Sequence, residues 1–182
     1  MGAICKPRRA PRIIEVNWLT PPFGWIKVNI DGAWKLDSNQ AGYGGVYRDY
    51  KGLVIGAFSS TLDIPSSVAA EVMAVIKAIE LAWVRDWKYV WLEVDSSLIL
   101  IFLRFPHLVP WRLRVQWSNC LHRISQMHFK SSHIFREGNQ AADALANYGA
   151  SSDGFTWWDS TPDFMMSHCN RDHLGLPNFR FR

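Results

Sequence analysis

The chain has 182 residues, of which 48% are hydrophobic, and its formal net charge is +4. This length suits one domain of ordinary size with short extensions, and the apolar content excludes a wholly disordered chain. The small positive charge permits a nucleic-acid partner without requiring one. Tryptophan is unusually frequent, at 10 residues, and we expect most of these side chains to pack in the core or the chain ends.

The cysteines and the apolar stretches exclude several classes of protein. Cys5, Cys120 and Cys169 are widely spaced and form no CxxC pair, so neither a disulfide framework nor a zinc site is indicated. The N-terminus lacks the apolar segment of a secretory signal, and the longest apolar stretch, residues 98–103, is too short to span a bilayer. We therefore expect an intracellular monomer in the nucleus or cytoplasm, neither secreted nor bound to a membrane.

Composition divides the chain into three parts. Residues 1–24 form a basic arm with several prolines; such a run is usually solvated, and nuclear import or phosphate binding is the less favoured role. Residues 25–149 carry the periodic patterns and form the predicted domain. Residues 150–182 are a polar and aromatic tail, in which His168, Cys169 and His173 lack the second half of a metal site. The charges of the arm are Lys6, Arg8, Arg9 and Arg12.

The domain begins with three runs typical of strands. In residues 25–33 apolar and polar side chains alternate, so the two sets face opposite sides of a strand. Residues 42–50 are glycine-rich and then aromatic, and residues 53–60 are apolar. The short turn at 49–52 predicts a hairpin between them. Three consecutive strands of this kind indicate an antiparallel meander.

Helices and further strands follow. Pro65-Ser66-Ser67 indicates the start of a helix, with a serine available as N-cap, and apolar residues recur at helical spacing to about residue 85. The later elements are a strand at 89–94, helices at 96–105 and 111–125, a strand at 127–135 and a helix at 140–148. The order βββαβααβα predicts an α/β fold of the mixed α+β kind. In it, helices flank a five-stranded mixed sheet whose later strands join in parallel through right-handed crossovers.

Two carboxylates stand at the ends of predicted strands. Asp31 is expected near the end of the first strand beside Gly32, where an ordinary turn residue is the alternative. Asp95 follows the strand at 89–94 and could equally cap the next helix. If these two strands are parallel neighbours, their carboxyl ends bring Asp31 and Asp95 to one edge of the sheet.

Two more carboxylates lie among apolar residues in helices. Glu71 borders the buried stripe of its helix, and Asp143 stands among alanines near the start of the last helix. An unpaired charge is costly to bury, so each needs a partner, although Asp143 could merely favour the helix dipole. Clustered carboxylates repel one another unless a cation neutralises them. Hard oxygen ligands select Mg²⁺ or Mn²⁺, and two such ions form a known clamp for displacement at phosphate.

Five stretches of the domain stand in a characteristic order and spacing. They are VNIDGAW (28–34), GYGGV (42–46), AAEVMAVIKAIELA (69–82), LEVDSS (92–97) and HIFREGNQAADALAN (133–147). Together they resemble the type 1 ribonuclease H family, and within it the plant reverse transcriptase-like branch related to retroelement ribonuclease H domains. The resemblance covers about residues 25–149. It implies the ribonuclease H-like fold, a five-stranded mixed sheet with helices on both sides.

The resemblance also implies an active site and a reaction. The metal-binding acids of the family match Asp31, Glu71, Asp95 and Asp143, and its mobile histidine, ten residues before the last acid, matches His133. A lone histidine is more often structural or exposed; the role expected here is to assist proton transfer or product release. The family cuts the RNA strand of RNA–DNA hybrids, so two Mg²⁺ ions and a hybrid partner are expected.

We expect contacts to nucleic acid from residues around these acids. The glycines would let backbone groups approach the RNA strand, or would only relieve crowding within the strands. The serines begin two helices and could bind phosphates through hydroxyls and helix N-termini, while Asn139 could orient the loop before Asp143. The full set is Gly32, Gly42, Gly44, Gly45, Ser66, Ser67, Ser96, Ser97 and Asn139.

Two departures from the family predict weaker substrate binding. Ser66-Ser67-Val68 stand where relatives often carry asparagines, so the family's contacts to the DNA strand are not carried over. Residues 106–110 hold no dense basic insertion, so a lysine-rich substrate handle is absent, and the expected consequence is a shallow salt dependence of binding. The nearby basic residues, which substitute in part or are ordinary solvated charges, are Arg104, Arg112, Arg114 and Arg123.

Three functions are compatible with these patterns. The four acids and His133 favour an active endonuclease for RNA–DNA hybrids. The short chain, with no polymerase region beside the domain, fits a non-catalytic nucleic-acid-binding remnant of a retroelement. A DNA-processing enzyme is the third alternative, because a fold does not by itself fix the substrate.

Overall fold

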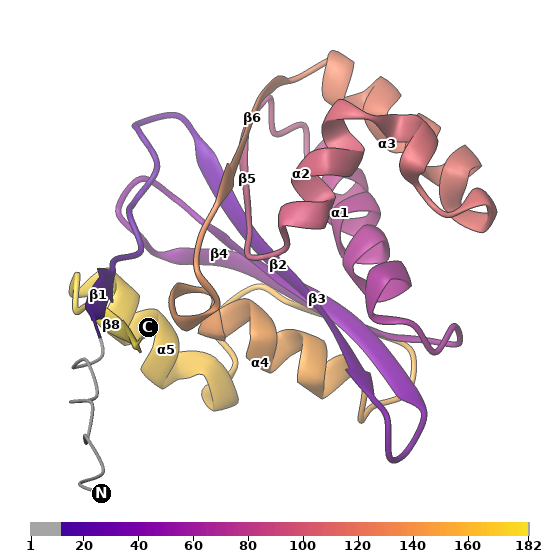
Figure 1. Cartoon of the computed structure of the whole chain (residues 1–182). Helices are drawn as coiled ribbons and strands as arrows, with labels where there is room; N and C mark the ends of the chain where they lie inside the picture. The colour runs from indigo at the N-terminus through magenta and orange to yellow at the C-terminus, as the bar shows by residue number, and fades with distance from the viewer. Residues whose placement is uncertain (1–11, 182) are drawn as a thin grey trace, which may run out of the picture.

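A six-stranded mixed sheet organises the molecule, in the order β6-β5-β2-β3-β4-β7 (Figure 1). The computed structural model describes residues 12–181. Of the predicted arm, Lys6, Arg8 and Arg9 lie outside the described residues, as does Cys5. The strands of this sheet are β2 (Ile26–Lys35), β3 (Gln40–Arg48), β4 (Val54–Leu62), β5 (Tyr89–Val94), β6 (His128–His133) and β7 (Phe155–Trp158).

The pairing of the strands confirms the predicted meander and crossovers. β2, β3 and β4 pair antiparallel in sequence, while β5 joins β2 in parallel and β6 joins β5 in parallel. The hairpin between β3 and β4 turns at residues 49–52. There Gly52 takes a φ of +79° and donates its N–H to the carbonyl of Asp49 at 2.9 Å. Glycine adopts this left-handed conformation without the steric cost of a side chain.

Within residues 12–181, five α-helices cover the two faces of the sheet. They are α1 (Ser67–Val84), α2 (Ser97–Arg104), α3 (Arg114–Ser125), α4 (Gln140–Gly149) and α5 (Met166–His173). The predicted helix at 111–125 begins as a 3-10 turn, Trp111–Leu113, before α3. From β2 to α4 the order is the predicted βββαβααβα.

The first face of the sheet carries the larger apolar core. α1, α2 and α3 lie together on this side (Figure 1), and Val28 and Ile30 of β2 are fully buried against them. Ser66 caps α1, since its side chain accepts a hydrogen bond from the N–H of Ala69 at 3.3 Å. A serine cap was predicted here, and the cap at Ser66 fixes where α1 begins and therefore where Glu71 lies on the helix.

The second face carries α4 and α5, and the predicted C-terminal tail supplies much of it. β7 pairs antiparallel with β4, so the sheet has six strands where five were predicted. Trp157 of β7 packs against the first core and Trp158 against the second. Cys169 and Asp172 are the residues of α5 whose side chains are buried against the rest of the domain. Residues 150–182 therefore fold onto the domain.

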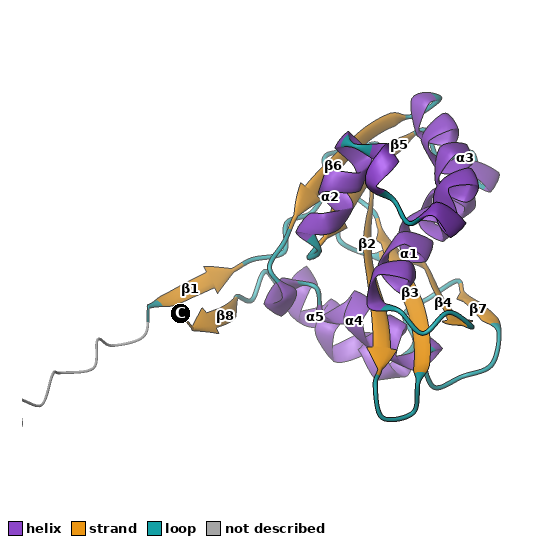
Figure 2. Ribbon diagram, turned by 45° about the vertical axis from the view of Figure 1, so that its right-hand side comes forward, coloured by secondary structure: helices purple, strands orange, loops and turns teal. Residues whose placement is uncertain are grey.

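Part of the predicted arm is also packed. β1 (Ile13–Val16) pairs antiparallel with β8 (Asn178–Phe181), and this small ribbon lies apart from the main sheet (Figure 2). Val16 and Trp18 are buried with Ile134. The two ends of the described chain therefore pair with each other, and of the two alternatives for the C-terminal segment, packed or loose, the pairing favours the packed one. Within residues 12–181, no helix combines the length and apolar character needed to cross a membrane.

Candidate active site

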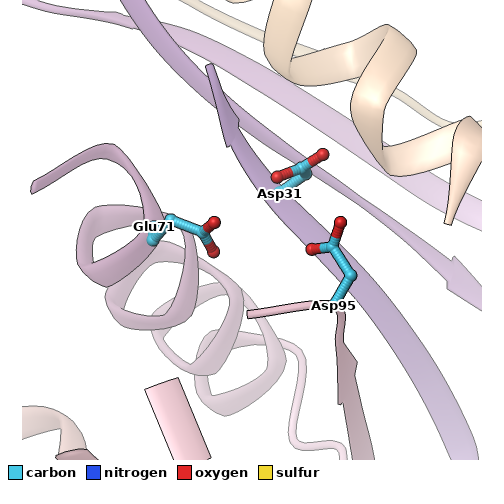
Figure 3. A group of neighbouring side chains, drawn as sticks. All are labelled: Asp31, Glu71 and Asp95. Carbon is cyan, nitrogen blue, oxygen red and sulfur yellow. The ribbon is translucent and has the colours of Figure 1, made fainter. Parts of the chain in front are cut away.

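Three of the four predicted acids converge at the end of β5. Asp31 comes from β2, Glu71 from the second turn of α1, and Asp95 from the residue after β5. One oxygen of each carboxylate lies within 4.8 Å of the others. Figure 3 shows the three side chains turned toward one another. The sequence prediction of a carboxylate cluster is thus realised in these three residues.

Asp31 reaches this position from the middle of its strand, which corrects the expectation of a strand end. β2 continues to Lys35, and Asp31 pairs with Gly44 of β3. The parallel pairing of β2 with β5, however, ends at Asn29 and Glu93. Asp31 and Asp95 each lie two residues beyond this last pair, so they face each other where the two strands separate. Neither ordinary alternative holds: Asp31 is not in a turn, and Ser96 rather than Asp95 is the N-cap of α2.

Gly32 brings α1 close enough for Glu71 to join the cluster. A Cβ atom at Gly32 would lie 2.4 Å from the backbone nitrogen of Glu71 and 2.8 Å from the Cβ of Ala70. Real side chains do not tolerate such contacts, so the helix approaches β2 only because residue 32 is glycine. The N–H of Gly32 also donates to Oδ1 of Asp31 at 2.7 Å. Gly32, expected to contact nucleic acid, therefore shapes the site itself.

The cluster is electrostatically unfavourable when its carboxylates are all ionised. Burial, and secondly the charge of Asp95, raises the pKa of Asp31 to about 8. Burial, with the charges of Asp31 and Asp95, raises the pKa of Glu71 to about 9. The pKa of Asp95 is also raised, chiefly by burial. Each shift means that removing water and placing like charges together favours the protonated acid.

The donor set fits a divalent cation. Among the described residues, Glu71 Oε2 and Asp95 Oδ1 are buried and have no hydrogen-bond partner. Buried polar atoms are normally paired, so two unpaired carboxylate oxygens within one acidic cluster are suited to bind a positive ion. Oxygen ligands of this kind suit hard ions such as Mg²⁺ and Mn²⁺. Asp31, Glu71 and Asp95 are the residues that could hold such an ion.

Asp143 lies beside this group but outside it. Its Oδ1 accepts a hydrogen bond from Nη2 of Arg136 at 2.9 Å, and its Oδ2 accepts one from Nδ2 of Asn147 at 3.0 Å. Arg136 belongs to a 3-10 turn just before α4, and its hydrogen bond to Asp143 raises its own pKa. Both partners were missed from the sequence. A basic residue seven positions before the last acid was the available signal for Arg136.

His133 ends β6, next to Asp95. Its side chain is exposed, and its Nε2 lies 3.0 Å from the backbone carbonyl oxygen of Asp95. The ring also makes an edge contact with Phe135. β5 and β6 are parallel neighbours, and His133 pairs with Val94 in their register. The predicted histidine therefore stands at the rim of the acidic cluster.

Three of the expected nucleic-acid contacts are instead core glycines. A Cβ atom would meet the backbone of Gly149 and Ala150 at Gly42, Leu145 at Gly44, and the ring of Phe58 at Gly45. All three glycines are buried. They allow α4 and the core to pack closely against β3, which is the crowding alternative. Their burial favours that alternative, and a contact with an RNA strand at these positions stays a prediction.

Asn139 is also buried rather than available to nucleic acid. It is 1% exposed, and its Nδ2 donates to the carbonyl of Ile30 at 2.9 Å. Its own carbonyl accepts the N–H of Asp143 at 3.1 Å. Asn139 therefore ties the start of α4 to the strand that carries Asp31. The expected role in orienting the segment before Asp143 agrees with this geometry, whereas direct contact with substrate does not.

The four predicted serines do stand at helix starts near the acids. Ser66 and Ser67 begin α1, and Ser96 and Ser97 begin α2. Ser67 lines a cleft of about 280 Å³ together with the three clustered acids, Arg136, Asn147 and Trp34. Trp34 is 40% exposed there, so an aromatic face that was not singled out from the sequence borders the cleft. Bases can stack on such rings.

Arg114, one of the basic residues that could replace a lysine-rich substrate handle, forms hydrogen bonds within the protein. Arg114 donates to the carbonyls of Val109 and His107, at 3.1 and 2.8 Å, and so holds the segment between α2 and α3 in place. Two 3-10 turns, Pro106–Leu108 and Trp111–Leu113, make up this segment. Arg114 therefore has a structural role and is unsuited to act as a mobile phosphate contact.

This arrangement of strands, helices and acids is the ribonuclease H fold. The chain superimposes on ribonuclease H1 of the halophilic archaeon Halobacterium salinarum with a TM-score of 0.62 and 24% identity, covering 70% of this chain and 98% of that one. It superimposes on the metagenomic LC11 ribonuclease H1, solved in complex with an RNA/DNA hybrid, with a TM-score of 0.60 and 26% identity, covering 69% and 96%.

The sequence comparisons specify the family. Residues 29–149 match the reverse transcriptase-like family, and the chain belongs to it. A protein of Arabidopsis thaliana, provisionally named a ribonuclease H protein, is 36% identical over 173 residues, which are 91% of this chain and 27% of that relative. The chain thus spans about a quarter of the length of that relative.

Proposed function

We propose that this chain is a metal-dependent endonuclease that hydrolyses the RNA strand of RNA–DNA hybrids. The observation that carries the proposal is the cluster of Asp31, Glu71 and Asp95, whose oxygens lie within 4.8 Å and include two buried atoms without partners. Such a cluster suits a cation at phosphate far better than it suits the stability of the fold. Membership of the reverse transcriptase-like family and the likeness to a hybrid-bound ribonuclease H1 support the choice of substrate.

Asp31, Glu71 and Asp95 are the proposed ligands of a first ion, and Asp143 is the proposed additional ligand of a second. When bound, two Mg²⁺ ions, or Mn²⁺ in their place, supply the charge that activates the attacking water and stabilises the leaving oxygen. For Asp143 to bind a metal ion, its carboxylate must first release the guanidinium of Arg136. This requires movement of an exposed side chain only, since Arg136 is 74% exposed.

The other residues of the site bind and orient the substrate or move protons. His133, beside the carbonyl of Asp95, is placed to accept or return a proton at the rim of the site. The hydroxyl of Ser67 lines the cleft and suits a phosphate oxygen at the start of α1. Trp34 offers a ring on which a base can stack. Telling RNA from DNA requires a contact to the 2′-hydroxyl, and Asn147 is a side chain of the cleft with the chemistry for it.

A panel of labelled substrates tests the proposal. The purified chain is incubated with an RNA–DNA hybrid, duplex DNA and duplex RNA, each with Mg²⁺, Mn²⁺ or EDTA. The proposal predicts cleavage of the RNA strand of the hybrid with either metal and none with EDTA. Preferential cleavage of duplex DNA would point to a DNA-processing enzyme. Binding of the hybrid without cleavage under any metal would favour the non-catalytic remnant.

A further inference from the structure

A group of charged and polar side chains lies buried on the second face of the sheet. Lys27 and Asn29 of β2 are 0% exposed, and Arg48 at the end of β3 is 1% exposed. Glu93 of β5 and Asp172 of α5 are buried with them. The group contains two cations and two anions, so its charges balance. Because buried charges are costly even when paired, so large a network in a small domain calls for a role besides stability.

The network forms a continuous chain of contacts from α5 to the start of α4. Nη1 of Arg48 donates to Oδ2 of Asp172 at 2.6 Å, and Nη2 of the same guanidinium donates to Oδ1 of Asn29 at 2.8 Å. Nδ2 of Asn29 donates to Oδ1 of Asn139 at 3.1 Å. The side chain of Asn139 then binds the carbonyl of Ile30, and its backbone carbonyl accepts the N–H of Asp143.

A second branch fixes the other side of the same group. Nζ of Lys27 lies 2.8 Å from Oε2 of Glu93, and that oxygen also accepts a hydrogen bond from Asn29 at 3.0 Å. Trp18 donates from Nε1 to Asn29 at 2.8 Å and stacks against the guanidinium of Arg48 at 3.7 Å. The side chain of Asn29 thus forms hydrogen bonds with four other side chains, so it has little freedom to take up a different position.

The start of α4 depends on this group because it lacks an ordinary cap. Asn139 is the N-cap residue, but its side chain makes no capping hydrogen bond to the helix. It is turned into the sheet instead, where it binds Asn29 and Ile30. The first turn of α4, and with it Asp143, is therefore anchored through the sheet.

We propose that Asp172 and Arg48 are positioning residues of the site, which act through Asn29 and Asn139 to hold the first turn of α4 and Asp143 against the strand of Asp31. Neither residue reaches the cleft. The consequence for catalysis rests on the proposed function, whereas the consequence for the geometry of α4 does not. The last described segment of the chain, from β7 to β8, thereby contributes to the geometry of the active site through Asp172.

Two variants test this role at different links. Asp172→Asn keeps the shape of the side chain but removes the charge that Arg48 binds. Arg48→Lys keeps a cation for Asp172 but has a single nitrogen, which cannot hold Asp172 and Asn29 in the manner of the two guanidinium nitrogens. Glu80→Gln is the matched control, because Glu80 pairs with Lys77 at the surface of α1, outside the network.

The direct measurement is native-state amide hydrogen exchange, residue by residue, on the whole chain. We expect the amides of Ala142 and Asp143 to exchange at least about tenfold faster in both variants, with a smaller change in the β3–β4 ladder and none in Glu80→Gln. We also expect the Kd for Mg²⁺ by calorimetry to rise roughly tenfold, as when a group that orients a metal ligand is lost.

A uniform rise in exchange over the whole sheet would show that the network only stabilises the fold, and would overturn the proposal. Unchanged exchange at the first turn of α4 in Arg48→Lys would also overturn the proposal. This test stands even if Asp172→Asn does not fold. Exchange needs no turnover, so its result stands if the chain proves unable to cleave hybrids. Equally, the proposed function can hold while the positioning role fails.

Discussion

The guanidinium of Arg136 donates a hydrogen bond to the carboxylate of Asp143, with 2.9 Å between Nη2 and Oδ1. The contact places a cation at the mouth of an acidic cluster, where burial raises the pKa of Asp31, Glu71 and Asp95 and the charge of Arg136 offsets a small part of that rise. It also occupies the one acid that stands apart from the others. Arg136 and an incoming metal ion therefore compete for the same charge.

Removing this competitor is expected to strengthen metal binding. In Arg136→Gln, Asp143 loses its ion pair but keeps the hydrogen bond from Asn147, and the repulsion between the guanidinium and an ion disappears. We expect a change of about 1 kcal/mol for an exposed group, or roughly fivefold in Kd. Calorimetric titration with Mg²⁺ measures it, with Arg112→Gln as the control for loss of one positive charge. Weaker binding in Arg136→Gln would mean that Arg136 organises Asp143 for the ion and does not compete with it.

The raised pKa values of the acids predict an unusual pH dependence of stability without metal. Asp31 and Glu71 ionise near their ordinary pKa of about 4 when unfolded, but at about 8 and 9 in the folded chain. The folded state therefore binds more protons over this window, so the free energy of unfolding falls as pH rises from about 4 to 9.

Thermal unfolding in EDTA at a series of pH values measures this slope. In Asp31→Asn the slope is expected to be shallower and the Tm at pH 8 higher, because one buried charge is gone. Saturating Mg²⁺ is expected to stabilise the wild type, by about 2.7 kcal/mol at 100 times Kd. A wild-type Tm that rises from pH 5 to 8 in EDTA would contradict the electrostatic account of the cluster.

The buried glycines of β3 are expected to matter for folding. In Gly44→Ala the new Cβ would lie 2.6 Å from the Cβ of Leu145 and 2.9 Å from the carbonyl oxygen of Phe58. α4 must then move away from the sheet, at a cost of about 1–3 kcal/mol. Denaturant unfolding measures the loss, with Gln40→Ala at the exposed start of the same strand as the control. Equal stability of the two variants would return these glycines to a role in substrate approach.

Loss of the C-terminal segment is expected to unfold the domain. A chain ended after Gly149 lacks β7, which covers the edge of β4, and lacks α5, which supplies Asp172 and covers the face that carries Arg48. Met165 and Cys169, which pack in the second core, are lost with it, so apolar side chains and charges that are buried in the full chain become exposed to water. Circular dichroism should show no cooperative transition near that of the full chain, whereas a chain ended after Pro177, which loses only β8, should retain one. A Tm within a few degrees for the shorter chain would show that residues 150–182 are dispensable.

Much of the fold could be predicted because most of its helices and strands are indicated by patterns among residues that are close in the sequence. The alternation in β2, the glycine turn after β3 and the cap at Ser66 each involve neighbouring residues, so the order from β2 to α4 agrees with the prediction. β7 was not predictable in the same way, since it has four residues and its strand character comes from pairing with β4, almost a hundred residues earlier.

The residues of the site also differ in how far the local sequence predicts them. Asp31 and Asp95 could be singled out because each lies at the end of a strand-like run, and Glu71 because it lies among apolar residues of a helix; the family motif around each then supported the choice. Lys27 and Arg48 were missed, since polar residues on an alternating strand do not reveal whether their face is solvated or covered. α5 covers that face here, and its partner for Arg48 lies more than a hundred residues along the chain. Only the tertiary structure brings these charges together.

The most direct test of the account compares the wild type with Asp95→Asn on a hybrid whose RNA strand carries the label. Asparagine keeps the shape of the side chain and removes the charge that completes the cluster. We expect the wild type to cut the RNA strand in Mg²⁺ and not in EDTA, and the variant to be at least about 100-fold slower at unchanged folding, because the bound ion supplies several kcal/mol of transition-state stabilisation. Cleavage by Asp95→Asn at the rate of the wild type would contradict the proposed role of the acidic cluster.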